Sequence, residues 1–588
     1  MKNVTQVLKQ LYLEAPDKVS VHLLFSRQSD QAITYRELLH GSARYAQALK
    51  QAKIRPGEVV ILTLDHGEDL LTAFWGVILN GSIPSILPFL TDKLSPEIYR
   101  KSLAALFGIT APTAVITDPD FMGEVQKASK WTSVRAIISS VEVQNRISDI
   151  TEVNFDQLHG LTSPPEDIVL LQHSSGTTGL QKGVALSHQA VFNQLESYSR
   201  ALDLNHNDVI VSWLPLYHDM GLIAGFLLPI LKRIPLVLMS PFDWVRAPYR
   251  LLQAISSYRG TLCWMPNFAY NFMAQKTRHR DLEGVDLSSL RAVINCSEPM
   301  YWKSHKMFLD HFQAYGLRSD ALATSYAMAE NVFAVTQGGI NSPVKLDVID
   351  QDAFLSRQTA EPVGETHERE NLWMQSDLTE NPSVLKMVSA GKPIEDTNMR
   401  ILDQQGVDLP ERHVGEIALQ SNCMLTGYYH RPDLTQKALL EGWYMTGDLG
   451  YLANGELYVT GRKKDLIIVG GKNIYPQDLE YLASEVEGIH AGRVAAFGVF
   501  NERTGTEDVV IVAEVDHDRL EARQPGSSDI QDQTERIAAE IRERVTRGSD
   551  IALRYVHVVD RNWLLKTSSG KVARRANREK YLSEFSGV

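Results

Sequence analysis

The segment at residues 174–188 constrains the fold most. It reads SSGTTGLQKGVALSH and lies between two apolar runs, at residues 168–171 and 184–186. Runs of this kind are typical of buried strands, so we expect a loop between two strands and not a flexible linker. Its glycines let backbone N–H groups converge, its hydroxyls add donors and Lys182 adds positive charge, which together predict a phosphate-binding loop. A Walker A loop is excluded, because Gly183 follows the lysine where that motif has Ser or Thr.

The composition indicates a globular enzyme with more than one domain. The 588 residues exceed what one hydrophobic core usually serves, and 44% hydrophobic and 22% charged residues are ordinary for a soluble enzyme. The net charge of -12 argues against nonspecific binding to nucleic acid, so no nucleic-acid partner is expected.

Neither the N-terminal segment nor the cysteines suggest export or a membrane. Residues 1–18 mix charges with apolar positions, which favours an amphipathic helix over a signal peptide. No apolar run reaches the about 20 residues that a bilayer span needs, so no membrane insertion is expected. Cys263, Cys296 and Cys423 lack the spacing of a metal site, so we expect reduced thiols in a cytoplasmic protein.

The pattern along the chain predicts an α/β fold. Between residues 35 and 340, apolar runs such as 58–64, 70–79, 209–214 and 236–239 alternate with helical patterns, as in layered α/β sheets. Residues 357–371 are polar and are expected to form an exposed insertion or loop. After residue 461 the strand patterns and a charged helix at about 530–547 have the size of a small α+β domain.

Five further segments accompany the glycine-rich loop in a fixed order: LPLYHDMGL (214–222), SYAMAEN (325–331), YMTGDLG (444–450), GRKKDLIIVGGK (461–472) and KTSSGKVAR (566–574). Together they resemble the signatures of the adenylate-forming superfamily, which includes acyl-CoA synthetases, luciferases and peptide-synthetase adenylation domains. Six matches in one order are far more specific than any single motif. The resemblance implies a large N-terminal domain of layered sheets and helices, residues 1–462, and a small mobile α+β domain, residues 463–588, hinged near Lys464.

The resemblance also implies ATP and Mg²⁺ as cofactors and a set of residues that bind them. The loop would hold the phosphates through Ser174, Ser175, Gly176, Thr177, Thr178, Gly179 and Lys182. Glu330 and Thr178 would bind the metal. Tyr326, Ala327 and Met328 would line the nucleotide site, and Ser297 and Glu298 would lie beside the adenine. Asp448 would accept hydrogen bonds from the ribose hydroxyls, with Arg462 as its companion; from its sequence alone, Asp448 could equally be a turn residue.

Catalytic roles are implied for Lys571, Glu330 and His218. A carboxylate and a phosphate repel one another, so a reaction between them needs cations and N–H donors where charge builds up. Lys571 would bridge the two anions, although a lysine in a basic tail is otherwise a solvated charge. His218 would position the substrate or serve as a structural histidine. Met220, Gly221, Ile223 and Phe226 could line an alkyl tunnel or belong to the core; the sequence leaves this open.

Within the superfamily, MPNFAY (265–270), TYREL (34–38) and NCSEP (295–299) resemble fatty-acyl-AMP ligases, and the polar segment within about 341–389 falls where those enzymes carry an insertion. This implies activation of a medium- or long-chain fatty acid to acyl-AMP and pyrophosphate. The acyl group would then pass to the phosphopantetheine thiol of an acyl carrier protein or synthase. The insertion would limit rotation of the small domain, so deleting roughly residues 357–371 should increase acyl-CoA formation.

Three alternatives remain. A fatty acyl-CoA synthetase differs only in its acceptor, and product analysis with CoA separates the two. An amino-acid adenylating enzyme is disfavoured, because no aspartate between the HDMG and SYAMAE motifs obviously pairs with an α-amine. A non-catalytic nucleotide sensor is disfavoured by the complete set of Glu330, Asp448, Arg462 and Lys571.

Overall fold

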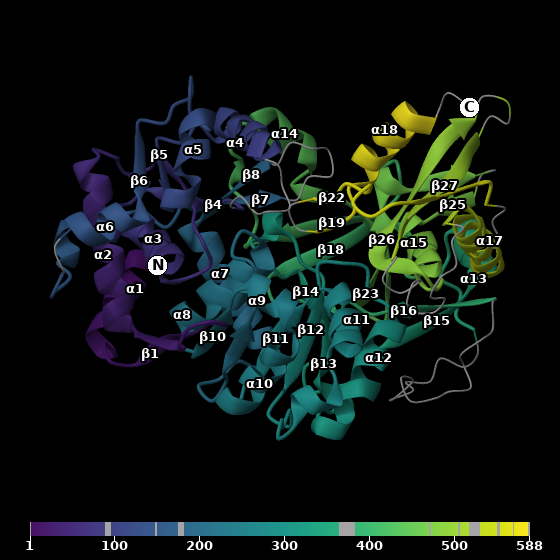
Figure 1. Ribbon diagram of the computed structural model, residues 1–588, viewed down its shortest axis with the longest axis horizontal. Coiled ribbons are helices and arrows are strands. Elements are labelled where there is room, and N and C mark those ends of the chain that lie inside the picture. Colours follow the sequence, from purple (N-terminus) through teal and green to yellow (C-terminus); the bar gives the residue numbers. More distant parts are fainter. Residues whose placement is uncertain are drawn as a thin grey trace.

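The alternating apolar runs of the first half form a mainly parallel seven-stranded sheet at the centre of the large domain (Figure 1). The computed structural model describes the chain apart from residues 1, 89–95, 148–149, 175–181, 364–382, 470–471, 502, 504–505, 517–529, 550–552, 568–569 and 586–588. The strand order is β13-β12-β11-β9-β10-β1-β2, with only β2 antiparallel to its neighbour. The strands are β1 (Val19–Leu24), β2 (Gln31–Thr34), β9 (Ile210–Ser212), β10 (Leu236–Met239), β11 (Leu262–Met265), β12 (Ala292–Cys296) and β13 (Leu322–Ser325).

A second parallel sheet has the order β4-β3-β5-β6. Its strands are β3 (Val59–Thr63), β4 (Ile83–Ile86), β5 (Ala114–Thr117) and β6 (Ala136–Ser139). Every residue of β3, VVILT, is buried, as expected for a parallel strand that is covered on both faces. The longer apolar run at 70–79 lies in helix α3 (Glu68–Leu79) and crosses from β3 to β4.

The predicted strands around the glycine-rich loop are β7 (Ile168–Ser174) and β8 (Lys182–Ser187). They pair antiparallel, and the short strand β20 (Gly427–Tyr428) adds to the other edge of β8. A five-stranded sheet follows, formed by β18 (Thr397–Leu402), β19 (Gly415–Ser421), β21 (Leu439–Leu440), β22 (Trp443–Ala453) and β23 (Glu456–Arg462). The short strands β14 (Thr336–Gln337) and β17 (Lys392–Pro393) pair with each other.

Helices cover these sheets. The expected N-terminal helix is α1 (Val4–Glu14), capped by Asn3, and α2 (Tyr35–Gln51) begins with a capping box between Thr34 and Glu37. The others in the large domain are α4 (Pro96–Thr110), α5 (Met122–Ala128), α6 (Ser140–Arg146), α7 (His188–Ala201), α8 (Leu228–Lys232), α9 (Pro241–Arg246), α10 (Tyr249–Tyr258), α11 (Asn267–Lys276), α12 (Trp302–Phe312) and α14 (Pro432–Ala438). In the described part of the chain, none is long and apolar enough to cross a membrane.

The polar segment at 341–389 contains a hairpin of β15 (Leu346–Asp350) and β16 (Val384–Val388), with helix α13 (Gln351–Arg357) after β15. The expectation of an exposed insertion or loop at 357–371 agrees with Arg357 and residues 361–363, which are exposed, and is wrong at Ala360. Ala360 is fully buried, and Thr359 bridges to His413 of the large domain. Residues 364–371 lie outside the described residues.

The smaller C-terminal domain lies at the upper right in Figure 1. Its strands are β24 (Ile467–Val469), β25 (Lys472–Ile474), β26 (Ile489–Asn501), β27 (Thr506–Val515) and β28 (Tyr555–Val559). Its helices are α15 (Pro476–Ser484), α17 (Ile530–Ser549), which is the expected charged helix, and α18 (Arg574–Phe585). The boundary predicted after residue 462 falls between the end of β23 and Ile467, the first residue of the small domain's own core.

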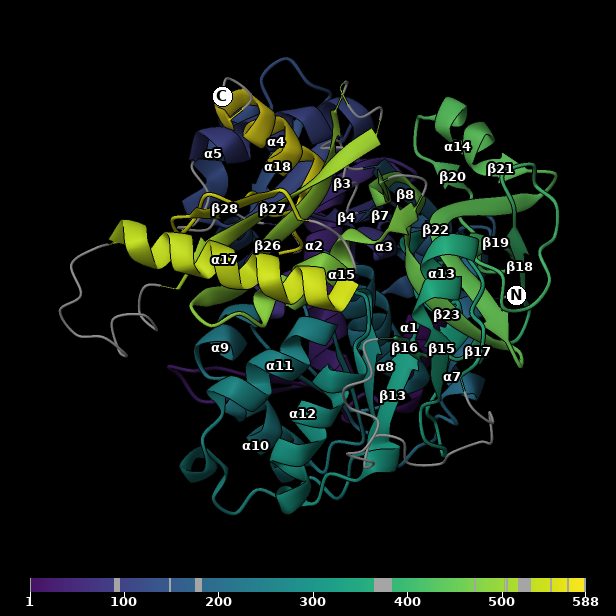
Figure 2. The ribbon, with the colours of Figure 1, turned by 90° about the vertical axis from the view of Figure 1, so that its right-hand side faces the viewer.

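In Figure 2, α15 and α17 of the small domain lie above α11 and α12 of the large domain. Helix α15 and Glu485, the residue directly after it, contact the start of α12. Tyr301 stacks on Tyr481 with ring centroids 4.3 Å apart, and its hydroxyl donates to the Gln477 carbonyl at 3.0 Å. The Lys303 ammonium lies 2.9 Å from the Glu485 carboxylate. Both aromatic and ionic contacts therefore hold the two domains together in this arrangement.

Candidate active site

A cleft of about 1680 Å³ lies between the large and the small domain. Its walls include the predicted site residues Lys182, His218, Ser297, Glu298, Tyr326, Ala327, Met328, Glu330, Asp448, Arg462 and Lys571. Of the other predicted residues, Ser175, Gly176, Thr177, Thr178 and Gly179 lie outside the described residues, as does the side chain of Ser174. Ser174 and Lys182 are paired across β7 and β8, and His173 and Lys182 line the cleft, so the strands bring both ends of the predicted phosphate loop close to it.

The topology explains why residues so distant in sequence meet here. Strands β9 to β13 run parallel, so their carboxyl ends share one edge of the sheet. Leu214, Pro241, Pro266, Ser297 and Tyr326 follow the ends of these strands and all line the cleft. Ligands of open α/β sheets bind at this edge.

Asp448 and Arg462 face each other across the antiparallel pair β22–β23. The Arg462 Nε lies 3.2 Å from Asp448 Oδ1, and the Tyr326 hydroxyl donates to Asp448 Oδ2 at 2.7 Å. The negative charge of Asp448 raises the pKa of the Arg462 guanidinium, so this arginine stays protonated. Each carboxylate oxygen keeps lone pairs, and the site can still accept hydrogen bonds from ligand hydroxyls.

Glu330 lies in the short 3-10 turn Ala329–Asn331 after β13. Its Oε1 accepts a hydrogen bond from the Tyr428 hydroxyl at 2.8 Å, and the Tyr444 hydroxyl lies 2.9 Å from that of Tyr428. The Lys182 ammonium sits 4.3 Å from the centroid of the Tyr428 ring. One tyrosine thus contacts both the candidate metal ligand and the lysine of the phosphate loop.

Lys571 reaches the cleft from a tight turn of the small domain. The Thr567 amide donates to the Lys571 carbonyl at 2.8 Å, and Gly570 adopts φ +79°, a conformation that favours glycine. Enclosure in the cleft and the neighbouring charge of Arg462 lower the pKa of the Lys571 ammonium, while Glu298 and Asp219 act in the opposite direction. This lysine is therefore a cation held close to both acidic and basic groups of the large domain.

His218 lies beside Tyr217 in the segment before the π-helix η4 (Met220–Leu227). Enclosure and the charge of Lys571 lower the pKa of His218 to about 3, so its imidazole is neutral at physiological pH. Its Nε2 is buried and has no hydrogen-bond partner among the described residues. A neutral ring adds no charge, which suits a positioning role better than proton transfer.

Ser297 and Glu298 follow β12. Ser297 adopts φ +70°, which is uncommon for a non-glycine residue. The Glu298 carboxylate accepts a hydrogen bond from the Phe268 amide at 3.0 Å and so caps the start of α11. Enclosure raises the pKa of the Glu298 carboxyl.

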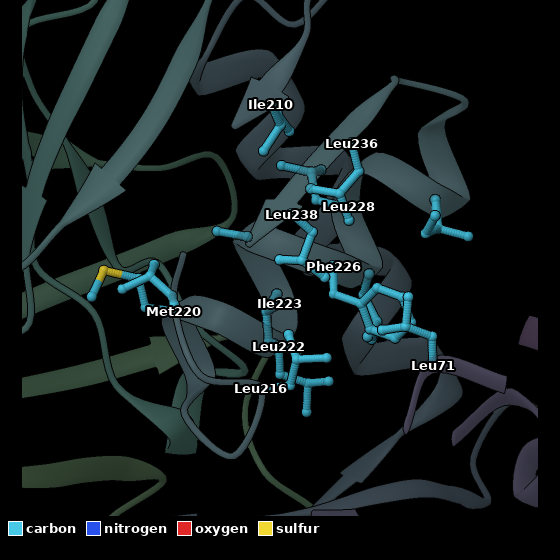
Figure 3. Close-up of a cluster of buried hydrophobic side chains, with 14 of the residues drawn as sticks. Leu71, Ile210, Leu216, Met220, Leu222, Ile223, Phe226, Leu228, Leu236 and Leu238 are labelled. Carbon is cyan, nitrogen blue, oxygen red and sulfur yellow. The ribbon is translucent and has the colours of Figure 1, made fainter. Parts of the chain in front are cut away.

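Met220, Gly221, Ile223 and Phe226, which could line an alkyl tunnel or belong to the core, all lie in helix η4. Met220 lines the cleft, whereas Ile223 and Phe226 are fully buried (Figure 3). A Cβ on Gly221 would lie 2.3 Å from the Pro215 carbonyl oxygen, so only glycine fits there. The apolar wall of the cleft comes instead from side chains at the strand ends and α11, namely Trp213, Leu214, Pro241, Pro266, Phe268 and Met300.

Sequence reasoning missed Tyr428 and the aromatic residues of this wall. Tyr444 belongs to a recognised motif but received no role. Tyr428 belongs to β20, a two-residue strand, and only its pairing with β8 brings it to the cleft.

The AMP-binding enzyme family matches residues 12–429. The chain belongs to this family. JamA of Moorena producens, a medium-chain-fatty-acid--[acyl-carrier-protein] ligase, is 28% identical over 94% of this chain and 90% of its own. FadD26 of Mycobacterium bovis, a long-chain-fatty-acid--AMP ligase, is 27% identical over 94% and 92%. The fatty acyl-adenylate ligase from L. pneumophila in complex with acyl adenylate and pyrophosphate is 27% identical, with a TM-score of 0.71, and the match covers 99% and 96% of the two chains.

As a member of the AMP-binding enzyme family, the chain is an ATP-dependent, AMP-forming ligase. The predicted resemblance to the adenylate-forming superfamily, and within it to fatty-acyl-AMP ligases, is confirmed. The predicted α/β class with a large N-terminal and a smaller C-terminal domain is also confirmed. All three cysteines are buried free thiols, and burial raises the pKa of Cys296 to about 12, which agrees with a packing role.

Proposed function

We propose that the protein activates a medium- or long-chain fatty acid with ATP to acyl-AMP and pyrophosphate. We further propose that it passes the acyl group to the phosphopantetheine thiol of an acyl carrier protein or synthase. The observation that carries the first step is the position of Lys571, which shares one cleft with Glu330, Asp448 and Arg462.

In the first step a carboxylate oxygen of the fatty acid attacks the α-phosphorus of ATP. The bond to the β-phosphate breaks, pyrophosphate leaves and the mixed anhydride acyl-AMP forms. The ammonium of Lys571 offsets the repulsion between the two anions and orients them, and it transfers no proton. Asp448 holds the ribose, with Tyr326 and Arg462 fixing its carboxylate.

The donor set of the cleft fits a magnesium ion. Among the described residues no group of three or more His, Cys, Asp or Glu side chains could hold a metal ion by itself, and Glu330 is the cleft carboxylate that we propose as a ligand. Mg²⁺ is commonly held by one or two carboxylates together with substrate phosphates and water. Glu330 would hold it, with Thr178 as the second proposed ligand, and the ion would neutralise charge on the phosphates.

The apolar wall supports an acyl substrate. Trp213, Phe268 and Met220 line the cleft beside His218, whose neutral imidazole can contact the substrate without adding charge. Each buried CH₂ group of an alkyl chain contributes about 0.8 kcal/mol. The medium- and long-chain substrates in the names of JamA and FadD26 agree with this wall.

In the second step the thiol sulfur attacks the acyl carbon, the bond to the AMP phosphate breaks, AMP leaves and the thiol gives up its proton. The small domain, which includes Lys571, has to move to admit the thiol. Contacts of the insertion support a restriction on that motion. Gln351 of α13 donates to the Gly548 carbonyl of the small domain at 3.2 Å, and Phe354 packs against Tyr475 with ring centroids 5.5 Å apart. JamA's name supports a carrier-protein acceptor.

Product analysis tests the proposal. The enzyme is incubated with ATP, Mg²⁺ and labelled laurate, then with CoA or with a holo carrier protein. We expect pyrophosphate and acyl-AMP in every case and a thioester only with the carrier protein. Efficient acyl-CoA formation would favour the CoA synthetase instead, and no ATP turnover with a panel of fatty acids would contradict the proposal as a whole.

A further inference from the structure

Tyr428 contacts three parts of the cleft: Lys182 at the start of β8, Glu330 and Tyr444. Through β20 it pairs with β8, which begins at Lys182. Its hydroxyl lies 2.8 Å from Glu330 Oε1 and 2.9 Å from the Tyr444 hydroxyl, while its ring carries the Lys182 ammonium at 4.3 Å. Tyr428 and Tyr444 are only 4% and 5% exposed, so water competes little for these contacts.

The chemistry of the groups fixes the direction of the hydrogen bonds. A carboxylate only accepts, so the single hydroxyl proton of Tyr428 is donated to Glu330. The Tyr428 oxygen then accepts from Tyr444, which gives a chain from Tyr444 through Tyr428 to Glu330. Burial raises the pKa of both tyrosines, and both remain donors at physiological pH.

The same residue separates two opposite charges. Lys182 and Glu330 both contact Tyr428, one at the ring face and the other at the hydroxyl, and they form no ion pair with each other in the described part of the chain. A direct pair would neutralise both groups and remove them from a ligand. An aromatic ring with a hydroxyl satisfies the cation through its π face and the anion through its O–H, so each stays close to the cleft.

We propose that Tyr428 is a positioning residue that keeps Glu330 oriented for a divalent cation and Lys182 ready for phosphate, before the nucleotide arrives. This inference rests on the proposed function, because it assumes that Glu330 holds the metal of a bound nucleotide. Mutation of a group that orients a metal ligand typically lowers metal affinity or activity by about 10- to 100-fold.

The test measures metal binding and not turnover. Mn²⁺ is titrated into the full-length protein with a non-hydrolysable ATP analogue, and free Mn²⁺ is followed by electron paramagnetic resonance. Tyr428→Phe keeps the ring and removes the hydroxyl. We expect it to weaken Mn²⁺ binding by about tenfold, while affinity for the analogue without metal stays within about twofold. Tyr444→Phe, which removes only the donor to Tyr428, should weaken Mn²⁺ binding less.

Matched variants make the outcome decisive. Tyr429→Phe removes the hydroxyl of the adjacent tyrosine, which stacks on His430, and should bind Mn²⁺ as the unmodified protein does. Glu330→Gln should lose Mn²⁺ affinity outright. If Glu330→Gln loses affinity and a folded Tyr428→Phe does not, the role of Tyr428 is wrong and the proposed function stands. If Glu330→Gln binds Mn²⁺ normally, the metal role of Glu330 in the proposed function fails first.

Discussion

Lys571 shows how much of the site depends on one side chain from the small domain. It lies in the cleft with the charges of Arg462, Glu298 and Asp219 around it, although it belongs to a turn close to the C-terminal helix. The effects of these neighbours on the pKa of Lys571 do not cancel. Enclosure and the charge of Arg462 lower it by more than the two carboxylates raise it. The residue is thus a cation whose charge is sensitive to alkaline pH.

Replacing Lys571 tests whether its charge is needed for adenylate formation or for ATP binding. Lys571→Ala should slow adenylate formation by about 10²- to 10³-fold, because a positioned charge at the reacting phosphate is lost, while ATP binding stays largely intact. Pyrophosphate exchange measures the first effect, and calorimetry with an ATP analogue measures the second. Exchange at the rate of the unmodified protein would contradict the assignment.

The lowered pKa of Lys571 also sets a pH dependence. In the proposed mechanism Lys571 acts as a protonated ammonium, so adenylation should fall as pH rises through a pKa below the ordinary value of about 10.4. Lys571→Arg stays charged throughout and should move this alkaline limb upward, even where its rate is lower. Pyrophosphate exchange is followed from about pH 7 to about pH 10. If the alkaline fall in rate occurs at the same pH in the arginine variant, a group other than Lys571 causes it.

Which residues come together in the cleft could largely be predicted from the sequence, but their contacts could not. The motifs predicted Glu330, Asp448, Arg462 and Lys571, and the structure brings all four to one cleft. Tyr428 was missed because its contacts with Glu330 and Tyr444 join segments that meet only through sheet pairing. A tyrosine in the segment LTGYYHRPD (425–433) carries no local signal of such a role.

At the scale of elements, the turn after Glu330 is strained. Val332 adopts φ 61° and ψ -54°, and the Phe333 amide donates to the Asn331 carbonyl at 2.6 Å, which is a γ-turn with a β-branched residue at its centre. Asn331 donates to the Ala334 carbonyl and Gln194 accepts from the Phe333 amide, so buried side chains hold the turn. Strained turns of this kind cluster at functional sites, and this one directly follows Glu330.

The insertion element allows a test of acceptor choice. Gln351→Ala removes the hydrogen bond to the Gly548 carbonyl and should ease movement of the small domain. Losing about 1 kcal/mol of contact shifts a two-state population about fivefold, so acyl-CoA formation should rise by about that factor. The rates of acyl-AMP and acyl-CoA formation are measured on the same preparation.

Arg357→Ala is the matched control on the same helix, since Arg357 pairs with Glu361 within the insertion and forms no ion pair with the described residues of the small domain. It should leave the products unchanged. A folded Gln351→Ala protein that makes acyl-AMP and still ignores CoA would count against this contact as a restraint. Point variants are preferable to deleting residues 357–371, because that segment includes the buried Ala360.

At the scale of the whole molecule, the sequence predicted two domains and an α/β class, but not the order of the strands. The order β13-β12-β11-β9-β10-β1-β2 places the N-terminal strands beside β10. The apolar sequence of a parallel strand does not specify which other strand it pairs with. The pairing is decided by the crossover connections and by packing. The cleft itself forms only when the small domain meets this sheet, which no local pattern encodes.

Buried histidines predict how the whole fold responds to acid. Burial lowers the pKa of His173 and His188 to about 4 and that of His305 to about 3, below their ordinary value of 6.5. Between pH 6.5 and pH 4 the unfolded chain therefore binds protons that the folded chain does not. The free energy of unfolding should fall as pH falls through this window, by at most about 1.4 kcal/mol per pH unit for each histidine.

His188→Asn isolates one contribution, because an asparagine oxygen can replace the His188 Nδ1 that accepts from the Val4 amide at 3.2 Å. Carboxyls whose pKa is raised, such as Asp219 and Glu298, act in the opposite direction, but they are the same in both proteins. Urea unfolding at several pH values should give a shallower loss of stability for the variant between pH 6.5 and about pH 4. Equal slopes would mean that His188 becomes protonated in the folded protein as readily as in the unfolded chain, and its burial would then not resist acid.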